Sequence, residues 1–414
     1  CAVCEKEYAP GFQYSCRSCE GLDKWSAMGA AVAFVIVVLI VVVFVLADLV
    51  RVVNSSKTVR GKLERRVLMF RDRLVKALPL TAIKTIVVTW QIITQFSAVV
   101  TVEYPTVYEN FLAVLNLINL NLGFILSFSC VVETDFYTHL VLATIFPLAM
   151  LMALVMTRFI ARKRNGHSLE ALRAVENKHI SVALFLLFMV YSSVSYIIFQ
   201  TFVCDTLDDE VSYLRADYSL VCSTSAHTAF KVYAGFMMLV YPIGIPAAFA
   251  WWLASNRHHL MRADPNGGPQ LNAIEPMRAL WAPYKPKRYY YEVIECIRRI
   301  ALTGLAVFIY PGSAAQVALE ALFAVVFNAI FEMQCPFINP LDKWLYRSGT
   351  WVIYFSMYLA LLLKVDVSDN DSSSQDVFAG LLIAAHSVMI LVVVVNGVLS
   401  GIEGFQKVVE QDIP

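Results

Sequence analysis

Apolar runs of about 20 residues recur along this chain of 414 residues, and each is long enough to cross roughly 30 Å of hydrocarbon as a helix. The composition agrees, since 58% of the residues are hydrophobic and only 16% are charged, whereas soluble domains average about 25% charged residues. These features exclude an ordinary soluble enzyme. They predict an all-α, polytopic transmembrane helix bundle.

Nine runs are interpreted as membrane spans. They cover residues 28–49, 82–102, 139–160, 180–203, 228–253, 293–309, 315–335, 344–363 and 378–399. We divide the chain into an extracellular cysteine-rich module (1–26), a first transmembrane helix (27–50), a basic cytoplasmic linker helix (51–80), a transmembrane bundle (81–400) and a cytoplasmic tail (401–414).

The distribution of basic residues predicts the orientation. Segments on one side of the nine-span map hold 24 lysines and arginines and those on the other side hold 5, and basic loops stay in the cytoplasm. We therefore expect a plasma-membrane protein with the N terminus outside and the C terminus inside. The net charge of +1 argues against a nucleic-acid partner.

One further apolar stretch, residues 108–132, is interpreted differently. As a tenth crossing it would put Arg162 outside and both Cys204 and Cys222 inside, which are unfavourable outcomes. It also carries Asn116, Asn119 and Asn121. We expect a re-entrant or interfacial helix on the outer side.

Cysteine spacing predicts disulfides on the outer side. Two C-x2-C pairs near the N terminus fit either a zinc site or a disulfide module, and an oxidising exterior favours disulfides. Cys204 and Cys222 bracket an acidic outer loop and are predicted to pair. Asn370 begins a glycosylation sequon in another outer loop. The N-terminal cysteines are Cys1, Cys4, Cys16 and Cys19.

The sequence YPIGIP interrupts the predicted span 228–253. Two prolines four residues apart each remove a helical hydrogen bond beside a glycine, so the helix should kink or open there. A gate or hinge is one interpretation, and a static kink is the other. The hinge candidates are Tyr241, Pro242, Gly244 and Pro246.

Charged residues cluster on the two spans that follow. Spacings of three and four residues let Glu295 face both Arg298 and Arg299, which favours either an internal salt-bridge network or an aqueous path. On the predicted span 315–335, Glu320, Asn328 and Glu332 fall within one polar stripe along the helix. The pore or gate candidates are Glu292, Glu295, Arg298, Arg299, Glu320, Asn328 and Glu332.

Several segments resemble a known family. The outer loop CDTLDDEVSYLRADYSLVC, the hinge span ending in YPIGIP, the segment YKPKRYYYEVIECIRRIALTGLAVFIYPGSAAQ and the motif CPFINPLDKWL resemble the transient-receptor-potential-like (TRP-like) membrane region of algal, oomycete and protist surface proteins. In that family, ephrin-receptor-like (GCC2/GCC3) cysteine-rich modules precede the membrane region, and CEKEYAPGFQYSCRSCEG is similar to such a module. The resemblance covers roughly residues 1–30 and 200–365. It implies a calcium-permeable, channel-like surface protein.

The chain departs from this pattern in one respect. Its loop VDVSDNDSSSQD, before the last span, is short and lacks selectivity-filter chemistry, so a path between the helices of one subunit, as in anoctamin-like folds, fits better than a central pore.

The leading hypothesis is a TRP-like cation channel, gated by membrane tension as one option. The alternatives are a non-conducting receptor or adhesion anchor, and a lipid scramblase or carrier. No catalytic motif, metal site or cofactor is predicted. The expected partners are membrane lipids, cations, a second copy of the chain, and matrix or surface proteins bound through the N-terminal module.

Overall fold

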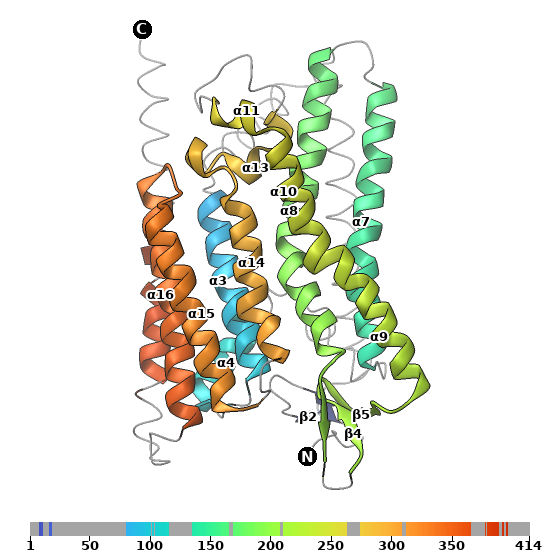
Figure 1. The fold of residues 1–414 in the computed structure, drawn as a ribbon, viewed down its shortest axis with the longest axis vertical. Coiled ribbons are helices and arrows are strands. Elements are labelled where there is room, and N and C mark those ends of the chain that lie inside the picture. Colours follow the sequence, from blue (N-terminus) through green and yellow to red (C-terminus); the bar gives the residue numbers. More distant parts are fainter. Residues whose placement is uncertain are drawn as a thin grey trace.

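The computed structural model describes residues 8–10, 16–18, 80–100, 102, 104–115, 135–164, 169–207, 210–262, 274–308, 312–365 and parts of 377–395 (Figure 1). Strands β1 (Tyr8–Pro10) and β2 (Cys16–Ser18) form an antiparallel pair near the N terminus. The pairing of the four N-terminal cysteines, the first predicted span, the basic linker, Asn370 and the tail lie outside the described residues.

The rest of the described chain is almost entirely helical. In chain order its elements are α3 (Leu80–Val99), α4 (Thr106–Leu115), α7 (Phe136–Arg164), α8 (Leu169–Gln200), β3 (Cys204–Thr206), β4 (Ser212–Leu214), β5 (Asp217–Val221), α9 (Ser225–Met238), the π-helix η4 (Leu239–Gly244), α10 (Ile245–Ser255), α11 (Arg257–Met261), the 3-10 helix η5 (Glu275–Met277), α13 (Arg278–Trp281), the 3-10 helix η6 (Pro286–Arg288), α14 (Tyr291–Thr303), the 3-10 helix η7 (Leu305–Phe308), α15 (Ala314–Gln334) and α16 (Pro340–Lys364). A further apolar helix covers Ala379–Val388.

Five helical stretches are long and apolar enough to cross a membrane: Thr81–Val99, Phe136–Lys163, Leu172–Gln200, Ser225–Ser255 and Ala314–Gln334. They correspond to five of the predicted spans, so the all-α class and the compatibility with a membrane are confirmed. The nine-span map stays a prediction. Helix α14 ends at Thr303, well before the expected end at residue 309. Helix α4 has only 10 residues, too few for a crossing.

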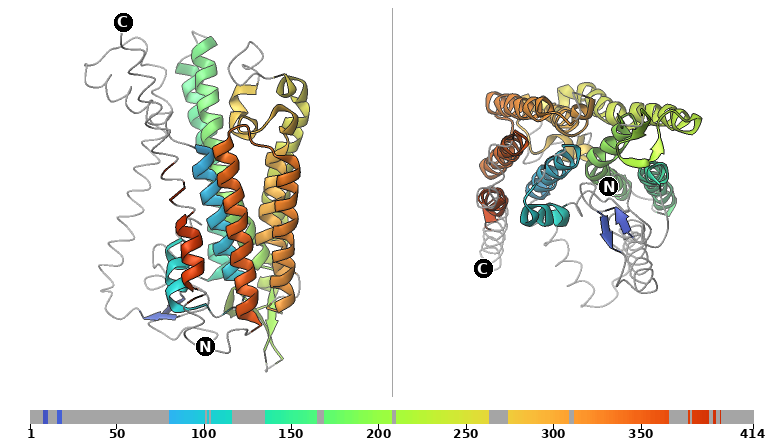
Figure 2. Two further views of the ribbon diagram at one scale, coloured as in Figure 1. Left: turned by 90° about the vertical axis from the view of Figure 1, so that its left-hand side faces the viewer. Right: turned by 90° about the horizontal axis from the view of Figure 1, so that it is seen from below.

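The helices pack around α3. Helix α3 contacts α8, α14 and α16, while α7 pairs with α8 and α15 pairs with α16. Viewed from below, α3 lies between the α15–α16 pair and α8 (Figure 2). One large apolar cluster joins α7, α8, α9 and α10, and a second joins α3, α4, α15 and α16. Buried polar groups between these clusters therefore lie in the interior of the bundle.

The connections separate into two ends. The end of α7, the start of α8, α11 and α13 lie at the upper end in Figure 1, and strands β3–β5 and helix α4 lie at the lower end. The described parts of the basic segments 158–179 and 255–290 therefore lie at the end opposite strands β3–β5.

The YPIGIP segment forms a π-helix rather than an opening. Helices α9, η4 and α10 run on without a break, Pro242 lies inside η4, and Pro246 lies in the first turn of α10. A wider turn accommodates the missing proline N–H groups, and π-turns often mark functional sites. The Tyr241 hydroxyl donates to the Thr144 carbonyl oxygen at 2.6 Å, which fixes η4 against α7.

Substitution of Gly244 tests whether this turn requires a glycine. A Cβ at Gly244 would lie 2.7 Å from the Leu239 carbonyl oxygen, whereas a Cβ at Gly235 would meet nothing within 4 Å. We expect Gly244→Ala to destabilise the fold by about 1–3 kcal/mol, because backbone must move. Gly235→Ala, the matched control, should be neutral or stabilising by up to about 1 kcal/mol. Thermal unfolding in detergent measures both, and equal melting temperatures would show that the turn tolerates a side chain.

Candidate functional site

Helix α14 carries four charged residues into the interior of the bundle. Glu292, Glu295, Arg298 and Arg299 are at most 4% exposed. Their spacings of three and four residues put them along one side of the helix, and the helix has a strongly one-sided character because its other positions are largely apolar. Ionised groups buried in this way need partners, since desolvation of each costs several kcal/mol.

Glu295 is the centre of an ion-paired group, as its spacing predicted. Arg298 donates to it from Nε at 3.0 Å and from Nη2 at 2.5 Å, and the Tyr346 hydroxyl donates at 2.6 Å. Arg299 lies 3.8 Å from the same carboxylate and donates from Nη1 to the Phe188 carbonyl oxygen at 3.1 Å. These contacts tie α14 to α16 and to α8.

Glu292 forms a second group one turn earlier. Lys84 of α3 contacts it at 2.5 Å, and the Tyr284 hydroxyl donates to it at 2.8 Å. The Lys84 ammonium also lies 4.0 Å from the centre of the Phe188 ring. Burial, followed by the nearby carboxylates of Glu292 and Glu295, raises the pKa of Tyr284 well above its ordinary value. Tyr284 therefore remains a hydrogen-bond donor.

A small cavity lies between these two groups. Its volume is about 20 Å³, and Lys84, Glu295, Arg298, Arg299 and Tyr346 are among the residues that line it. This space holds about one water molecule and no organic substrate. We refer to Lys84, Tyr284, Glu292, Glu295, Arg298, Arg299 and Tyr346 as the ionic cluster.

A polar seam continues from the ionic cluster along α3 and α8. Gln91 donates from Nε2 to the Met189 carbonyl oxygen at 2.8 Å, and Gln95 donates to Ser193 Oγ at 3.2 Å. Gln91 Oε1, Ser192 Oγ and Ser195 Oγ are buried and have no hydrogen-bond partner. Further polar residues are buried on α3, α8, α14 and α15, and we refer to the whole set as the polar seam: Thr85, Thr89, Gln91, Thr94, Gln95, Ser97, Ser192, Ser193, Ser195, Thr303, Gln316 and Glu320.

The three residues of the predicted stripe on α15 lie in different surroundings. Glu320 is 1% exposed, and neither carboxylate oxygen has a hydrogen-bond partner. Asn328 accepts a hydrogen bond from Thr350 at 3.2 Å. Glu332 is exposed and pairs with Arg347 of α16. The structure thus brings Glu292, Glu295, Arg298 and Arg299 together and leaves the α15 residues apart from them.

One hydroxyl group connects the hinge to the charged helix. The Tyr191 hydroxyl of α8 lies 3.4 Å from the Pro242 carbonyl oxygen and 3.4 Å from the Cys296 carbonyl oxygen. No sequence signal singled out Tyr191 or Tyr346. Lys84 is a lysine inside a predicted span, but it lies 208 residues from its partner Glu292. Tyr284 belongs to an aromatic, basic segment 8 residues before Glu292, and nothing in that spacing indicated the hydrogen bond between them.

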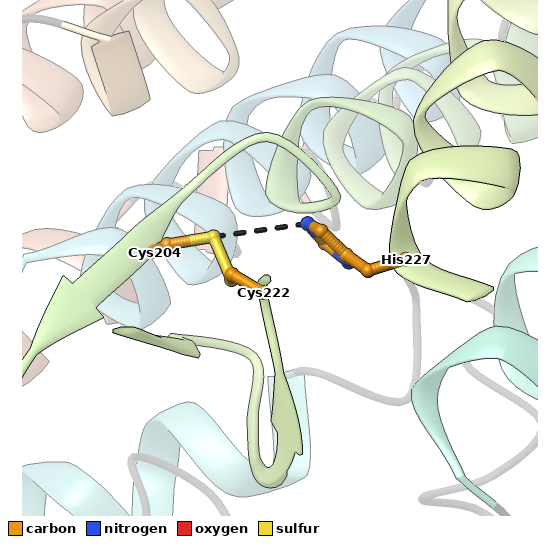
Figure 3. Close-up of side chains that lie close together, drawn as sticks. All are labelled: Cys204, Cys222 and His227. Carbon is orange, nitrogen blue, oxygen red and sulfur yellow. Dashed lines mark hydrogen bonds between the residues drawn. A yellow bond between two sulfur atoms is a disulfide. The ribbon is translucent and has the colours of Figure 1, made fainter. Parts of the chain in front are cut away.

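The lower end of the bundle holds the predicted disulfide. Cys204 and Cys222 are bonded, and they join β3 to the residue that follows β5. His227 of α9 places Nε2 3.7 Å from Cys204 Sγ and Nδ1 2.9 Å from the Tyr137 hydroxyl (Figure 3). Cys204, Cys222 and His227 are close enough to hold a metal ion. Because the two sulfurs are bonded to each other, however, neither offers a thiolate ligand.

An ion pair supports the same hairpin. Asp205 of β3 accepts hydrogen bonds from Arg215 Nε and from the Tyr218 hydroxyl, each at 2.8 Å. Burial alone would raise the pKa of Asp205, but hydrogen bonds from Arg215 and Tyr218 and the charge of Arg215 outweigh it, so this pKa lies below its ordinary value.

No protein-family model, curated protein or solved structure matches this chain.

Removal of a carboxylate charge tests the ionic cluster. Glu295→Gln leaves the buried Arg298 and Arg299 without a counter-charge, so we expect a loss of about 3–5 kcal/mol in the free energy of unfolding. Glu332→Gln breaks an exposed pair and should cost about 0–1 kcal/mol. Thermal unfolding in detergent compares the two variants. If the two variants lost similar amounts of stability, the burial of the ionic cluster would not determine how much it contributes to the free energy of unfolding.

Acid titration tests the hairpin. Because the pKa of Asp205 is lowered in the fold, its contribution to stability is complete above the pKa of the unfolded chain and disappears as the pH falls through the folded value. We expect the protection of the β3–β5 amides, measured as the ratio of the intrinsic to the observed exchange rate at each pH, to fall in acid. Asp205→Asn should exchange rapidly at neutral pH as well, while the exposed control Glu210→Gln should behave like the wild type. Unchanged protection of Asp205→Asn would contradict this assignment.

Proposed function

We propose that this protein is a multi-pass cation channel of the plasma membrane, here with its path closed. The observation that carries the proposal is the polar seam, a set of buried polar residues on α3, α8, α14 and α15, beside the ionic cluster. Polar and ionisable groups are costly inside membrane helices, and they usually face an aqueous path or a partner. Several seam atoms, Gln91 Oε1 among them, have no hydrogen-bond partner within the part of the chain that the structure describes.

The proposed gate combines η4 with the start of α14. Tyr191 touches the carbonyl oxygens of Pro242 and Cys296, so a movement of the π-helix is transmitted to the charged helix. Arg299 donates to Phe188 of the same helix α8 that carries Tyr191. A change in the η4 turn would therefore act on α14 through Tyr191 and, by way of α8, through the contact between Phe188 and Arg299. Membrane tension, which shifts tilted helices, is the proposed stimulus.

Charge and sequence patterns supply the remaining proposals. The excess of basic residues at one end supports an N terminus outside the cell and a C terminus inside. The TRP-like resemblance supports calcium permeation, and the N-terminal cysteine-rich module would bind matrix or surface proteins. Because the seam lies between the helices of one chain, we propose a path within each subunit of a homo-oligomer.

Conductance of the reconstituted protein tests the function. In liposomes, we expect the wild type to pass cation current that rises with membrane tension. Gln91→Leu replaces a buried polar side chain of the seam with an apolar one of similar size, and should lower single-channel conductance at least tenfold. The control Thr157→Val removes a hydroxyl on α7 that bonds only to its own helix, and should leave the current unchanged.

Two outcomes would overturn the channel. A folded protein that carries no current at any tension or voltage is better described as a non-conducting surface anchor. Lipid transfer between leaflets without current would favour a scramblase.

A further inference from the structure

Glu320 differs from the other buried acids of the described bundle. Glu292 contacts Lys84, and Glu295 contacts Arg298 and Arg299. Glu320, on the second turn of α15, is 1% exposed and makes no hydrogen bond through either oxygen. An ionised carboxylate in that position would be desolvated without compensation, at a cost that other buried acids avoid by pairing.

Its surroundings offer no counter-charge. Burial on α15 extends to Val317, Ala321 and Ala324, which belong to the apolar cluster shared with α3 and α16. The described titratable groups that other elements bring to this cluster are Tyr104 before α4, Tyr108 on α4, Tyr354 on α16 and His386 on the helix Ala379–Val388. Among the charged residues of the packed helices, Lys84 contacts Glu292, Arg298 and Arg299 contact Glu295, and Arg347 contacts Glu332.

The same surroundings favour a proton over a metal ion. Calcium takes six to eight oxygen ligands, and other hard cations also need several. Around Glu320 the apolar cluster supplies carbon atoms, and among the described residues no oxygen ligand lies within hydrogen-bond distance of its carboxylate. A proton needs only the carboxylate itself and removes the charge that burial penalises.

A polar neighbour, Gln316, lies between Glu320 and the N-terminal end of α15. Gln316 is one turn closer to the end, is fully buried, and accepts a hydrogen bond from the Gly312 backbone N–H at 2.8 Å. Gly312 lies in the turn immediately before α15, whose N-cap is Ser313. A proton would thus reach the carboxylate from this end of the bundle past Gln316.

We propose that Glu320 is a reversible proton-binding site within the membrane bundle, occupied when the seam is closed. The binding of the proton does not depend on ion conduction, so this proposal can fail or succeed independently of the channel.

Infrared spectroscopy of the full-length protein in lipid nanodiscs tests the site. At neutral pH we expect the carbonyl stretching band of a protonated carboxylic acid, shifted in deuterated water. Glu320→Gln should remove it, and Glu320→Asp should move it to a new frequency. Glu332→Gln, the matched control on the same helix, should leave it unchanged because Glu332 is ionised and paired with Arg347.

Thermal unfolding provides a second measurement that does not use the infrared band. As the pH rises above neutral, the melting temperature of the wild type should fall relative to that of Glu320→Gln, because only the wild type must retain a proton that the unfolded chain releases. A wild type without the band would overturn the proposal. So would a melting temperature that rises with sodium or calcium only when Glu320 is present, since that result would assign a metal ion instead.

Discussion

The compensation of buried charge on α14 is the interaction on which the rest of the bundle depends. Glu295 neutralises Arg298 and Arg299, while Lys84 neutralises Glu292, so four helices and the segment before α14 must meet at one place. Apolar packing alone allows helices to slide or rotate, since lipid tails are as apolar as leucine. Directional ion pairs and tyrosine hydroxyls fix the register of α3, α8, α14 and α16 in a way that leucines cannot.

The ionic cluster and the π-helix η4 both contact helix α8. Helix α8 carries Phe188, which accepts from Arg299, and one turn later Tyr191, which touches both η4 and α14. A rigid charged centre therefore lies beside a locally widened helix. Such a pairing of fixed and deformable parts suits a protein that changes between two arrangements, because the deformable part can move while the charges stay compensated.

The sequence predicted the helices better than their ends or their tertiary partners. Long apolar runs identified α3, α7, α8, α9–α10 and α15, because hydropathy is a local property. It could not reveal that Gly304, at the end of α14, packs so closely against α8 that a Cβ would lie 2.2 Å from the Phe199 ring, since that contact comes from another helix. In the same way, helical spacing predicted the pairing of Glu295 with its arginines. Lys84, Tyr284 and Tyr346 lie on other segments, and only the tertiary fold brings them into contact with the carboxylates of α14. Glu320 is buried, whereas Glu332 lies near the end of α15 and meets Arg347, a difference in surroundings that helical periodicity does not reveal.

Helices α3 and α8 run in the same direction, and both hydrogen bonds between their side chains and partners span 98 residues of sequence. During synthesis, Gln91 and Gln95 therefore leave the ribosome long before Met189 and Ser193 exist. The nascent α3 must wait in the translocon or the lipid with its amides unsatisfied until α8 is inserted. Biogenesis of this protein thus carries an early stage at which quality-control machinery can recognise an incomplete bundle.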